Sequence, residues 1–231
     1  MNKKELEKFV LELGASKVGV GNLIEVLPEK YSHLKTGISF CIRLSDQIID
    51  EITDEPTHTY FHHYRTVNRL IDHIGLMIAL KLQEHGYLAM PVPASQSINV
   101  EGFNYSGIFQ HRTAATRAGV GWIGKNACLV TEEFGPRVRL GTVLTNMDIE
   151  EYDEPVNMSK CGDCRVCVSK CPSIALTGEA WDVNKVREDL VDPEVCSRHM
   201  AREYKHIGRG VVCGICIQSC PMGNKRIRQK K

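Results

Sequence analysis

The segment CGDCRVCVSKCP (161–172) is the most informative part of this sequence. Its cysteines follow the spacing Cys-x2-Cys-x2-Cys-x3-Cys-Pro, at Cys161, Cys164, Cys167 and Cys171. In bacterial ferredoxins the first three thiolates of such a run hold one 4Fe–4S cluster, and the fourth ligates the other cluster. The proline after the fourth cysteine cannot continue a hydrogen-bond ladder, so it turns the chain. The spacing therefore predicts a ferredoxin-like module with two clusters.

A second, shorter motif repeats the later half of this run. It is CGICIQSCP (213–221), and the cysteine that it lacks at its start is supplied upstream by Cys196. Crossing the fourth ligands then gives each cluster four thiolates and uses eight cysteines. The two predicted ligand sets are Cys161, Cys164, Cys167 and Cys220 for the first cluster, and Cys171, Cys196, Cys213 and Cys216 for the second.

Zinc and disulfides are the alternatives for these cysteines. Paired CxxC units bind zinc in ribbons, but a zinc ion takes four ligands and does not require the complete run ending in Cys-Pro. No export signal is visible at the N-terminus, and cytosolic thiols stay reduced, which disfavours disulfides. The remaining two of the ten cysteines, Cys41 and Cys128, lie in apolar, strand-like runs. They are predicted to be small buried hydrophobic residues.

The overall composition is that of an ordinary globular protein. The formal net charge is +1, so no global attraction to nucleic acid or to an anionic membrane is expected. No apolar run approaches the ~20 residues that a membrane-spanning helix needs. We therefore expect a cytoplasmic protein without a membrane partner.

Helix and strand patterns alternate in the first part of the chain. Helices are predicted at 3–13, 57–85 and 109–118, and strands at 17–21, 37–44, 87–92, 127–131 and 138–145. This mixture predicts an α+β domain over residues 1–155, followed by the two-cluster domain over residues 156–231.

The glycine-rich segment AGVGWIGKN (118–126) matches the dinucleotide fingerprint G-x-G-x-x-G literally. Its context is wrong, because a helix pattern precedes it and a strand pattern follows, so we exclude a Rossmann site. Gly121 and Gly124 still permit positive φ and close approach to a flat or anionic ligand. Lys125 and Asn126 would then offer side-chain donors to that ligand. The alternative is a tight turn without a ligand.

Several segments together resemble a known family. RAGVGWIGKNACLV (117–130), FGPRVRLGTVLTN (134–146) and the cysteine run that follows are similar, in order and spacing, to the epoxyqueuosine reductases. These belong with the reductive dehalogenases in a cobalamin-dependent iron–sulfur superfamily. YFHHYRTVNRLIDHI (60–74) and MPVPAS (90–95) share the likeness, which spans most of residues 1–222.

The resemblance implies a flavin-reductase-like (nitroreductase-like) α+β fold for the first domain. Its cavity would hold a corrin, with the glycine-rich segment at the wall, and the two-cluster module would dock against it and reduce the cobalt. The implied function is that of an oxidoreductase, a cobalamin-dependent reductase of a small molecule or a modified nucleoside. An external electron donor such as flavodoxin or ferredoxin would supply the clusters.

The resemblance also suggests residues for this site. Epoxyqueuosine reductases carry an aspartate proton donor upstream of the glycine-rich segment, and Tyr105 lies near that position. Reductive dehalogenases use a tyrosine, so Tyr105 is the candidate acid, with a packed loop tyrosine as the alternative. His111 and Arg112 would face the cofactor or its phosphate-bearing tail, or else form a surface pair. Arg137 and Arg139 would meet phosphate or solvent.

One further residue and one departure from the family shape the remaining expectations. Arg209 precedes the second CxxC, where related proteins bring the chain near the corrin, and it completes the cofactor-binding candidates. Epoxyqueuosine reductases continue into a helical-repeat domain that helps to hold tRNA, whereas this chain ends soon after Cys220. We expect weak or no tRNA binding, since only the basic tail at 225–231 favours it. The alternatives to an enzyme are an electron-transfer or cobalamin-handling module without its own substrate, and a ferredoxin fused to a structural domain.

Overall fold

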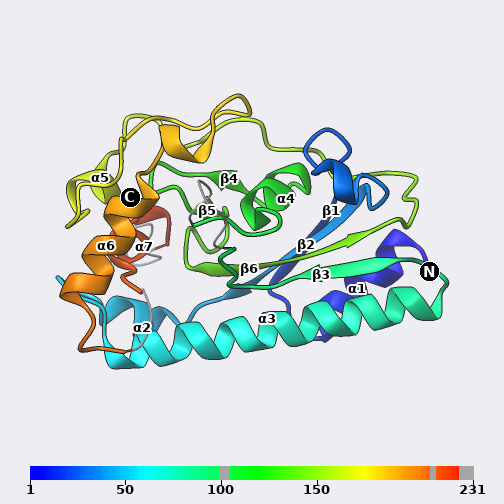
Figure 1. The fold of residues 1–231 in the computed structure, drawn as a ribbon, viewed down its shortest axis with the longest axis horizontal. Coiled ribbons are helices and arrows are strands. Elements are labelled where there is room, and N and C mark those ends of the chain that lie inside the picture. The colour runs from blue at the N-terminus through cyan, green and yellow to red at the C-terminus, as the bar shows by residue number, and fades with distance from the viewer. Residues whose placement is uncertain (99–104, 209–211, 224–231) are drawn as a thin grey trace. The chain divides into compact units, whose positions relative to one another are not determined.

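The computed structural model describes residues 1–98, 105–208 and 212–223. The chain forms two compact units, each assembled from segments that are distant in sequence (Figure 1). Unit 1 consists of residues 1–42, 67–121 and 139–156, and unit 2 of residues 43–66, 122–138 and 157–231. A division into domains near residue 155 stays a prediction.

Unit 1 is built on a four-stranded sheet in the order β1-β2-β6-β3. The strands are β1 (Lys17–Asn22), β2 (Thr36–Arg43), β3 (Ala89–Val92) and β6 (Val138–Thr145). Both outer strands are antiparallel to their neighbours, with Val18 opposite Phe40 and Met90 opposite Leu144. The central strand β2 is buried along nearly all of its length, which explains its continuous apolar sequence.

Helices cover both faces of this sheet, as Figure 1 shows for α3 and α4. They are α1 (Lys3–Glu12), α3 (His58–Glu84) and α4 (His111–Arg117). The short 3-10 helix η1 (Glu29–Tyr31) lies in the connection between β1 and β2. A capping box starts α1, where Asn2 and Glu5 bond each other's backbone amides. Gly86, at φ +82°, follows the end of α3, where glycine readily adopts this left-handed conformation.

The contact between α4 and β1 depends on two glycines. A Cβ on Gly19 would lie 2.1 Å from the carbonyl oxygen of Ala118, and one on Gly21 would lie 2.6 Å from the carbonyl carbon of Arg117. No side chain fits at either position, so β1 must expose bare backbone for the end of α4 to pack against it.

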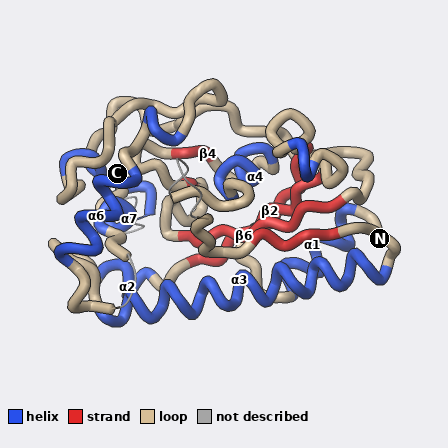
Figure 2. Tube along the Cα trace, in the orientation of Figure 1, coloured by secondary structure: helices blue, strands red, loops and turns tan. Residues whose placement is uncertain are grey.

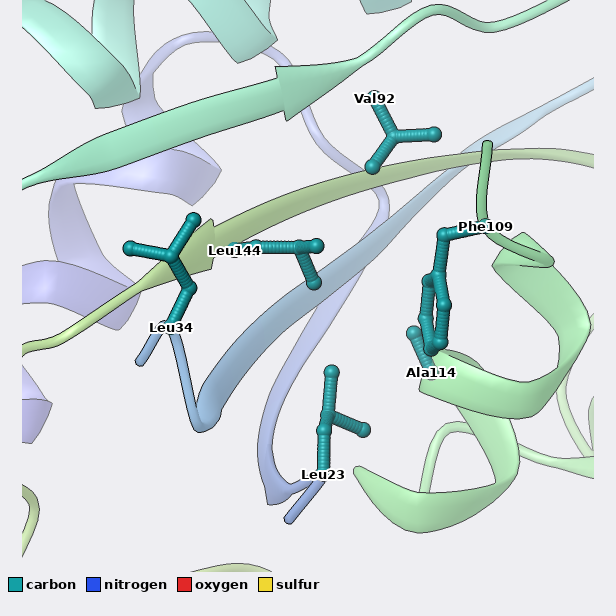
Figure 3. Packing of buried hydrophobic residues seen from close by; sticks show 6 residues of the cluster. All are labelled: Leu23, Leu34, Val92, Phe109, Ala114 and Leu144. Atoms are coloured by element: carbon teal, nitrogen blue, oxygen red, sulfur yellow. The ribbon is translucent and has the colours of Figure 1, made fainter. Parts of the chain in front are cut away.

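Apolar side chains from the loops and strands of unit 1 meet beside α4. Figure 3 shows this cluster, which draws on the strands β3 and β6 and on the start of α4. Its members are Leu23, Leu34, Val92, Phe109, Ala114 and Leu144. Burial of these side chains is the largest stabilising contribution available to a unit of this kind.

Unit 2 has little regular structure, and loops make up much of it (Figure 2). Its elements are α2 (Asp46–Asp50), β4 (Trp122–Ile123), β5 (Leu129–Val130), α5 (Val166–Ser169), η2 (Arg187–Asp189), α6 (Pro193–Glu203), α7 (Ile215–Gln218) and η3 (Pro221–Gly223). The strand predicted at 127–131 is shortened to β5, because it pairs only with the two-residue β4 in a hairpin. The overall architecture is thus a mixed α/β fold with a cysteine-rich part.

None of the helices in the described part of the chain combines the length and apolar character that crossing a membrane requires.

Candidate functional site

The two CxxC loops of unit 2 share one local conformation. Each begins Cys-Gly with the glycine in the left-handed region, at φ +53° for Gly162 and +83° for Gly214. Each then enters a short helix, so that Cys167 lies in α5 and Cys216 in α7. A left-handed glycine after the first cysteine reverses the chain, so that the next thiol turns toward the same point as the first.

One group of four thiols surrounds Cys167. Burial, followed by the neighbouring sulfurs of Cys220, Cys161 and Cys164, raises the pKa of the Cys167 thiol to about 12. Burial likewise raises the pKa of Cys220 to about 11, with Cys161 and Cys164 again as electrostatic neighbours. Among them only Cys164 is exposed. This group contains the same residues as the ligand set predicted for the first cluster.

A second group surrounds Cys196, which lies in α6. Burial raises the pKa of this thiol to about 11, and the next contributions come from Cys213 and Cys171. Cys216 lies among the same residues, with Cys213 and Cys196 as electrostatic neighbours. Thiols with raised pKa values must lose their protons to bind a metal, so ligation here releases protons. This group matches the set predicted for the second cluster and has one further member, Cys128.

The donor chemistry of both groups fits 4Fe–4S clusters, which are held by four thiolates each. Within the described residues, no three His, Cys, Asp or Glu side chains gather in the manner of a single-ion site. The roles of the individual cysteines as ligands are carried forward as a proposal.

The glycine-rich turn between β4 and β5 contacts both cysteine loops. The Lys125 side chain is buried, at 7% exposure, and its Nζ donates to the carbonyl of Gly162 at 2.7 Å. The side-chain amide of Asn126 donates to the carbonyl of Cys216 at 3.4 Å. Lys125 and Asn126, which were predicted to donate to a ligand, therefore donate to backbone carbonyls instead. Lys125 bonds the first cysteine loop and Asn126 the second. Their direct contact with a cofactor stays a prediction.

Gly124 allows the first cysteine to lie close to this turn. A Cβ at Gly124 would come within 2.8 Å of a Val130 methyl carbon and 3.5 Å of the Cys161 sulfur. The turn closes with a hydrogen bond from the Ala127 amide to the Gly124 carbonyl at 2.8 Å, and Ala127 itself has φ +55°. Gly121, the other glycine of the prediction, is buried ahead of β4.

Arg137 is buried in unit 2 and ion-paired within it. Its guanidinium reaches Asp46 at 3.2 Å and Asp50 at 2.7 Å, both in α2. Burial alone would raise the pKa of Asp46, but Arg43 and Arg137 together hold it below its usual value. Sequence reasoning assigned Arg137 to phosphate or solvent and missed these carboxylates, because they lie far away in the chain.

In unit 1, the His111 side chain forms hydrogen bonds with the backbone just after β3 and with a side chain of β6. His111 Nε2 lies 3.0 Å from the carbonyl of Pro93, and its Nδ1 lies 2.9 Å from Thr142 Oγ1. Since a carbonyl only accepts, Nε2 carries the proton and Nδ1 accepts from the threonine. Burial lowers the pKa of His111 to about 4, and Arg139 lowers it as well. His111 is therefore neutral at physiological pH.

Arg139 is tied to the same region. Its Nε donates to Asn68 Oδ1 at 3.0 Å, and its Nη2 reaches the carbonyl of Ala94 at 3.4 Å. The amide of Ala94 in turn donates to Asp72 at 2.8 Å. His111, Arg139 and Asp72 thus form hydrogen bonds with the backbone of residues 93–94. The sequence alone did not indicate this role.

The other predicted site residues lie apart from these hydrogen bonds or outside the described residues. Tyr105 has φ +65° and is 39% exposed, next to the bridge that pairs Ile98 with Ser106. Arg112 is half-buried in the first turn of α4. Arg209 lies outside the described residues.

Comparison with known proteins identifies the cysteine-rich segment. Residues 160–223 match the family described as "4Fe-4S double cluster binding domain". The prediction of two 4Fe–4S clusters is thereby confirmed.

The sequence resemblance to epoxyqueuosine reductases is confirmed as well. The chain is 40% identical over 121 residues to the epoxyqueuosine reductase of Gloeobacter violaceus, covering 50% of this chain and 36% of that protein. It is 27% identical over 222 residues to that of Synechocystis sp., covering 90% of this chain and 68% of that protein. The chain spans only 35% to 37% of the length of the first three curated relatives that it matches.

Solved structures agree on the fold. A reductive dehalogenase whose structure "suggests a mechanism for B12-dependent dehalogenation" matches with a TM-score of 0.73 at 18% identity, covering 97% of this chain and 32% of that one. An epoxyqueuosine reductase matches with a TM-score of 0.60 at 19% identity, covering 96% of this chain and 65% of that one.

One prediction is wrong in the light of these matches. Weak or no tRNA binding was expected because only the basic tail at 225–231 favours it. The second solved structure holds an epoxyqueuosine-modified stem loop of tRNA-Tyr, and the matching relatives are epoxyqueuosine reductases. These matches overturn the expectation that tRNA binding is weak or absent.

Proposed function

We propose that this chain, a homologue of the epoxyqueuosine reductases, is an iron–sulfur oxidoreductase that passes electrons from two 4Fe–4S clusters to a reducible cofactor. The observation that carries the proposal is that the eight predicted ligands lie in two groups, with Cys128 beside the second group. Each group draws three cysteines from its own segments and one from the other motif, Cys220 or Cys171. Bound clusters supply one-electron transfer at low potential.

The chain's own residues position these clusters. Lys125 and Asn126 fix the carbonyls of Gly162 and Cys216, one in each cysteine loop. Gly124 keeps the space beside Cys161 free of side-chain atoms. A single short turn thus holds both ligand loops, which favours a fixed geometry around the two clusters.

Cobalamin is the acceptor that we propose, within a flavin-reductase-like sheet domain. The support is the sequence resemblance, together with the similar fold of a reductive dehalogenase whose dehalogenation is described as B12-dependent. Cobalamin would supply low-valent cobalt chemistry when bound. The neutral His111, Arg112, Arg139 and the glycine-rich segment remain the proposed neighbours of the corrin. Tyr105, partly exposed and in a left-handed conformation, remains the proposed proton donor.

A modified nucleoside in tRNA is the substrate class that the relatives favour. They are epoxyqueuosine reductases, and one is solved with a modified tRNA stem loop. We propose a cytoplasmic location and an external donor such as flavodoxin or ferredoxin. The second candidate function is a module that reduces or delivers a corrinoid without a substrate of its own.

The test combines metal analysis with spectroscopy. Protein made anaerobically with cobalamin supplied should contain about eight iron atoms and eight sulfides per chain. Its electron paramagnetic resonance spectrum should show reduced clusters and cob(II)alamin together. Zinc in place of iron would contradict the whole proposal, and iron without corrinoid binding would contradict only the cobalamin part. Turnover of an epoxyqueuosine-containing stem loop, compared with the unmodified stem loop, separates an enzyme from a corrinoid-handling module.

A further inference from the structure

The two cysteine loops of unit 2 share a backbone conformation but differ in what covers them. Gly162 and Gly214 each follow the first cysteine of their loop, and both are left-handed. A Cβ at Gly162 would meet no heavy atom of a more distant described residue within 4 Å. A Cβ at Gly214 would lie 2.7 Å from Tyr60 Cε1 and 2.9 Å from Ile52 Cδ1. Among the described residues, an aromatic ring therefore covers the second loop at the position where the first is open.

The covering ring belongs to the first turn of α3, which also contacts the chain just ahead of the second loop. Tyr60 is 2% exposed. His58 Nδ1 donates to the carbonyl of Ile207 at 2.9 Å. A Cβ at Gly208 would lie 2.5 Å from Cε1 of the Phe61 ring. The start of α3 thus packs against the chain both before and within the second cysteine loop, and all of these residues belong to unit 2.

We propose that Tyr60 is a positioning residue for the second cluster, whose ring holds the loop 213–216 in place and keeps water away from it. The inference rests on the proposed iron–sulfur function. The apolar shell around a metal site controls its access to solvent, and solvent exposure is one of the factors that set a cluster's reduction potential. Water stabilises the reduced cluster, which carries one more negative charge. Tyr60 thereby lowers the reduction potential of the second cluster.

The experiment is an anaerobic redox titration followed by electron paramagnetic resonance, on the whole chain with its clusters. Tyr60→Leu removes the ring carbons that reach Gly214 but keeps an apolar side chain, whereas Tyr60→Phe keeps the ring. Tyr64→Leu is the matched control, because Tyr64 lies one turn further along α3 with its ring centroid 6.5 Å from that of Tyr60. The Cys196→Ala variant identifies which signal belongs to the second cluster.

We expect Tyr60→Leu to keep its iron and to raise the reduced-to-oxidised ratio of the second cluster about tenfold at a fixed potential. For a one-electron couple this is a shift of about 59 mV to higher potential. Tyr60→Phe should retain the potential of the unsubstituted protein, because the ring is still present. The first cluster and the Tyr64→Leu variant should be unchanged.

A pair of glycine variants tests the same contact without removing the ring. Gly162→Ala and Gly214→Ala both place a side chain in the left-handed region, so they share the same kind of backbone strain. Only Gly214→Ala also meets the Tyr60 ring. The iron lost from Gly214→Ala should be about twofold that lost from Gly162→Ala. Adding Tyr60→Leu to Gly214→Ala should restore part of it.

Several results would overturn the inference. An unchanged second-cluster potential in Tyr60→Leu would show that the ring excludes no water that matters. An equal shift of both clusters would indicate a general structural effect, and an equal shift in Tyr60→Phe would assign the effect to the hydroxyl. If Tyr60→Leu does not fold, the glycine pair decides, and equal iron loss in its two members contradicts the proposal. If the unsubstituted chain holds no iron, the proposed function fails first, so the two failures are distinguishable.

Discussion

The two units of this chain obtain their stability from different sources. Unit 1 has a four-stranded sheet and an apolar cluster that includes Leu23, Phe109 and Leu144. Unit 2 has two-residue strands, and its helices α5 and α7 are only four residues long. Elements this short are unstable on their own. Unit 2 also buries apolar side chains, among them Ile49, Trp122 and Trp181. The comparison therefore indicates that unit 1 combines apolar burial with a regular sheet, whereas unit 2 depends in addition on ligation by its cysteines, since cluster binding contributes directly to folding.

The strongest way to break this comparison is to remove one cluster. Cys216→Ser should reduce the iron content from about eight to about four atoms per chain, because it takes one thiolate from the second set alone. Hydrogen exchange should then accelerate greatly in α6 and α7, while β1 and β3 keep their protection. Iron analysis and exchange mass spectrometry of anaerobic protein measure both effects.

The Cys128→Ala variant is the control for this change, since it removes a neighbouring sulfur that the cluster does not need. Full iron in Cys216→Ser would remove Cys216 from the ligand set. Equal loss of protection in β1 would show that unit 1 also depends on the cluster.

A smaller effect is expected at the ion pairs of Arg137. This side chain is 2% exposed, and Asp46 and Asp50 are partly exposed. Arg137→Met should lower the free energy of unfolding by about 3 kcal/mol, because it leaves two carboxylates without their buried partner. Denaturant unfolding of the cluster-containing protein measures it.

Arg43→Met is the matched control, because Arg43 also pairs with Asp46 but is 37% exposed. An exposed pair contributes about 1 kcal/mol or less, so the control should be mild. Equal losses in the two variants would contradict a special role for burial in unit 2.

A pH effect sharpens the comparison from the side of unit 1. Burial lowers the pKa of His111 from 6.5 to about 4. Below pH 6.5 His111 is protonated in the unfolded chain but stays neutral in the folded chain. The free energy of unfolding therefore decreases as the pH falls from about 6.5 toward 4. The loss from pH 7 to pH 5 should be about 2 kcal/mol.

The His111→Gln variant should lack this part of the pH dependence, because glutamine does not titrate. The measurement is the difference in unfolding free energy between the two proteins at pH 7 and pH 5. The same slope in both would show that His111 accepts a proton in the folded state. His85, an exposed residue at the end of α3, supplies a matched control as His85→Gln.

Local pattern predicted the long elements well. The helix expected at 57–85 is α3 (His58–Glu84), and the strand expected at 37–44 is β2 (Thr36–Arg43). Both have long periodic or continuous apolar runs and clear ends, Gly86 in the case of α3. Cysteine spacing predicted the two clusters for a similar reason, because ligand geometry restricts the loop that carries it.

Contacts between distant segments were beyond local pattern. Nothing near Arg137 in the sequence indicates Asp46 and Asp50, and nothing near Lys125 indicates Gly162. These pairs depend on which segments join in one unit, and unit 2 takes residues 43–66 and 122–138 from within the sheet-forming half. The sequence predicted the polar residues of the glycine-rich turn as donors, but only the fold shows what accepts from them.

The smallest predicted effect separates the two clusters within that turn. Lys125→Met removes a buried cation that lies 2.7 Å from the Gly162 carbonyl in the first cysteine loop. A nearby positive charge favours the reduced cluster, so the first cluster's reduction potential should fall by about 30 to 60 mV in the variant. Redox titration followed by electron paramagnetic resonance measures it, and Lys160→Met, at a half-exposed lysine paired with Glu132, is the control. Because Asn126, and not Lys125, bonds the second loop, the second potential should stay constant. A shift of the second cluster instead would mean that the turn acts on both loops as one rigid piece, and the distinction between a lysine contact to the first loop and an asparagine contact to the second would be lost.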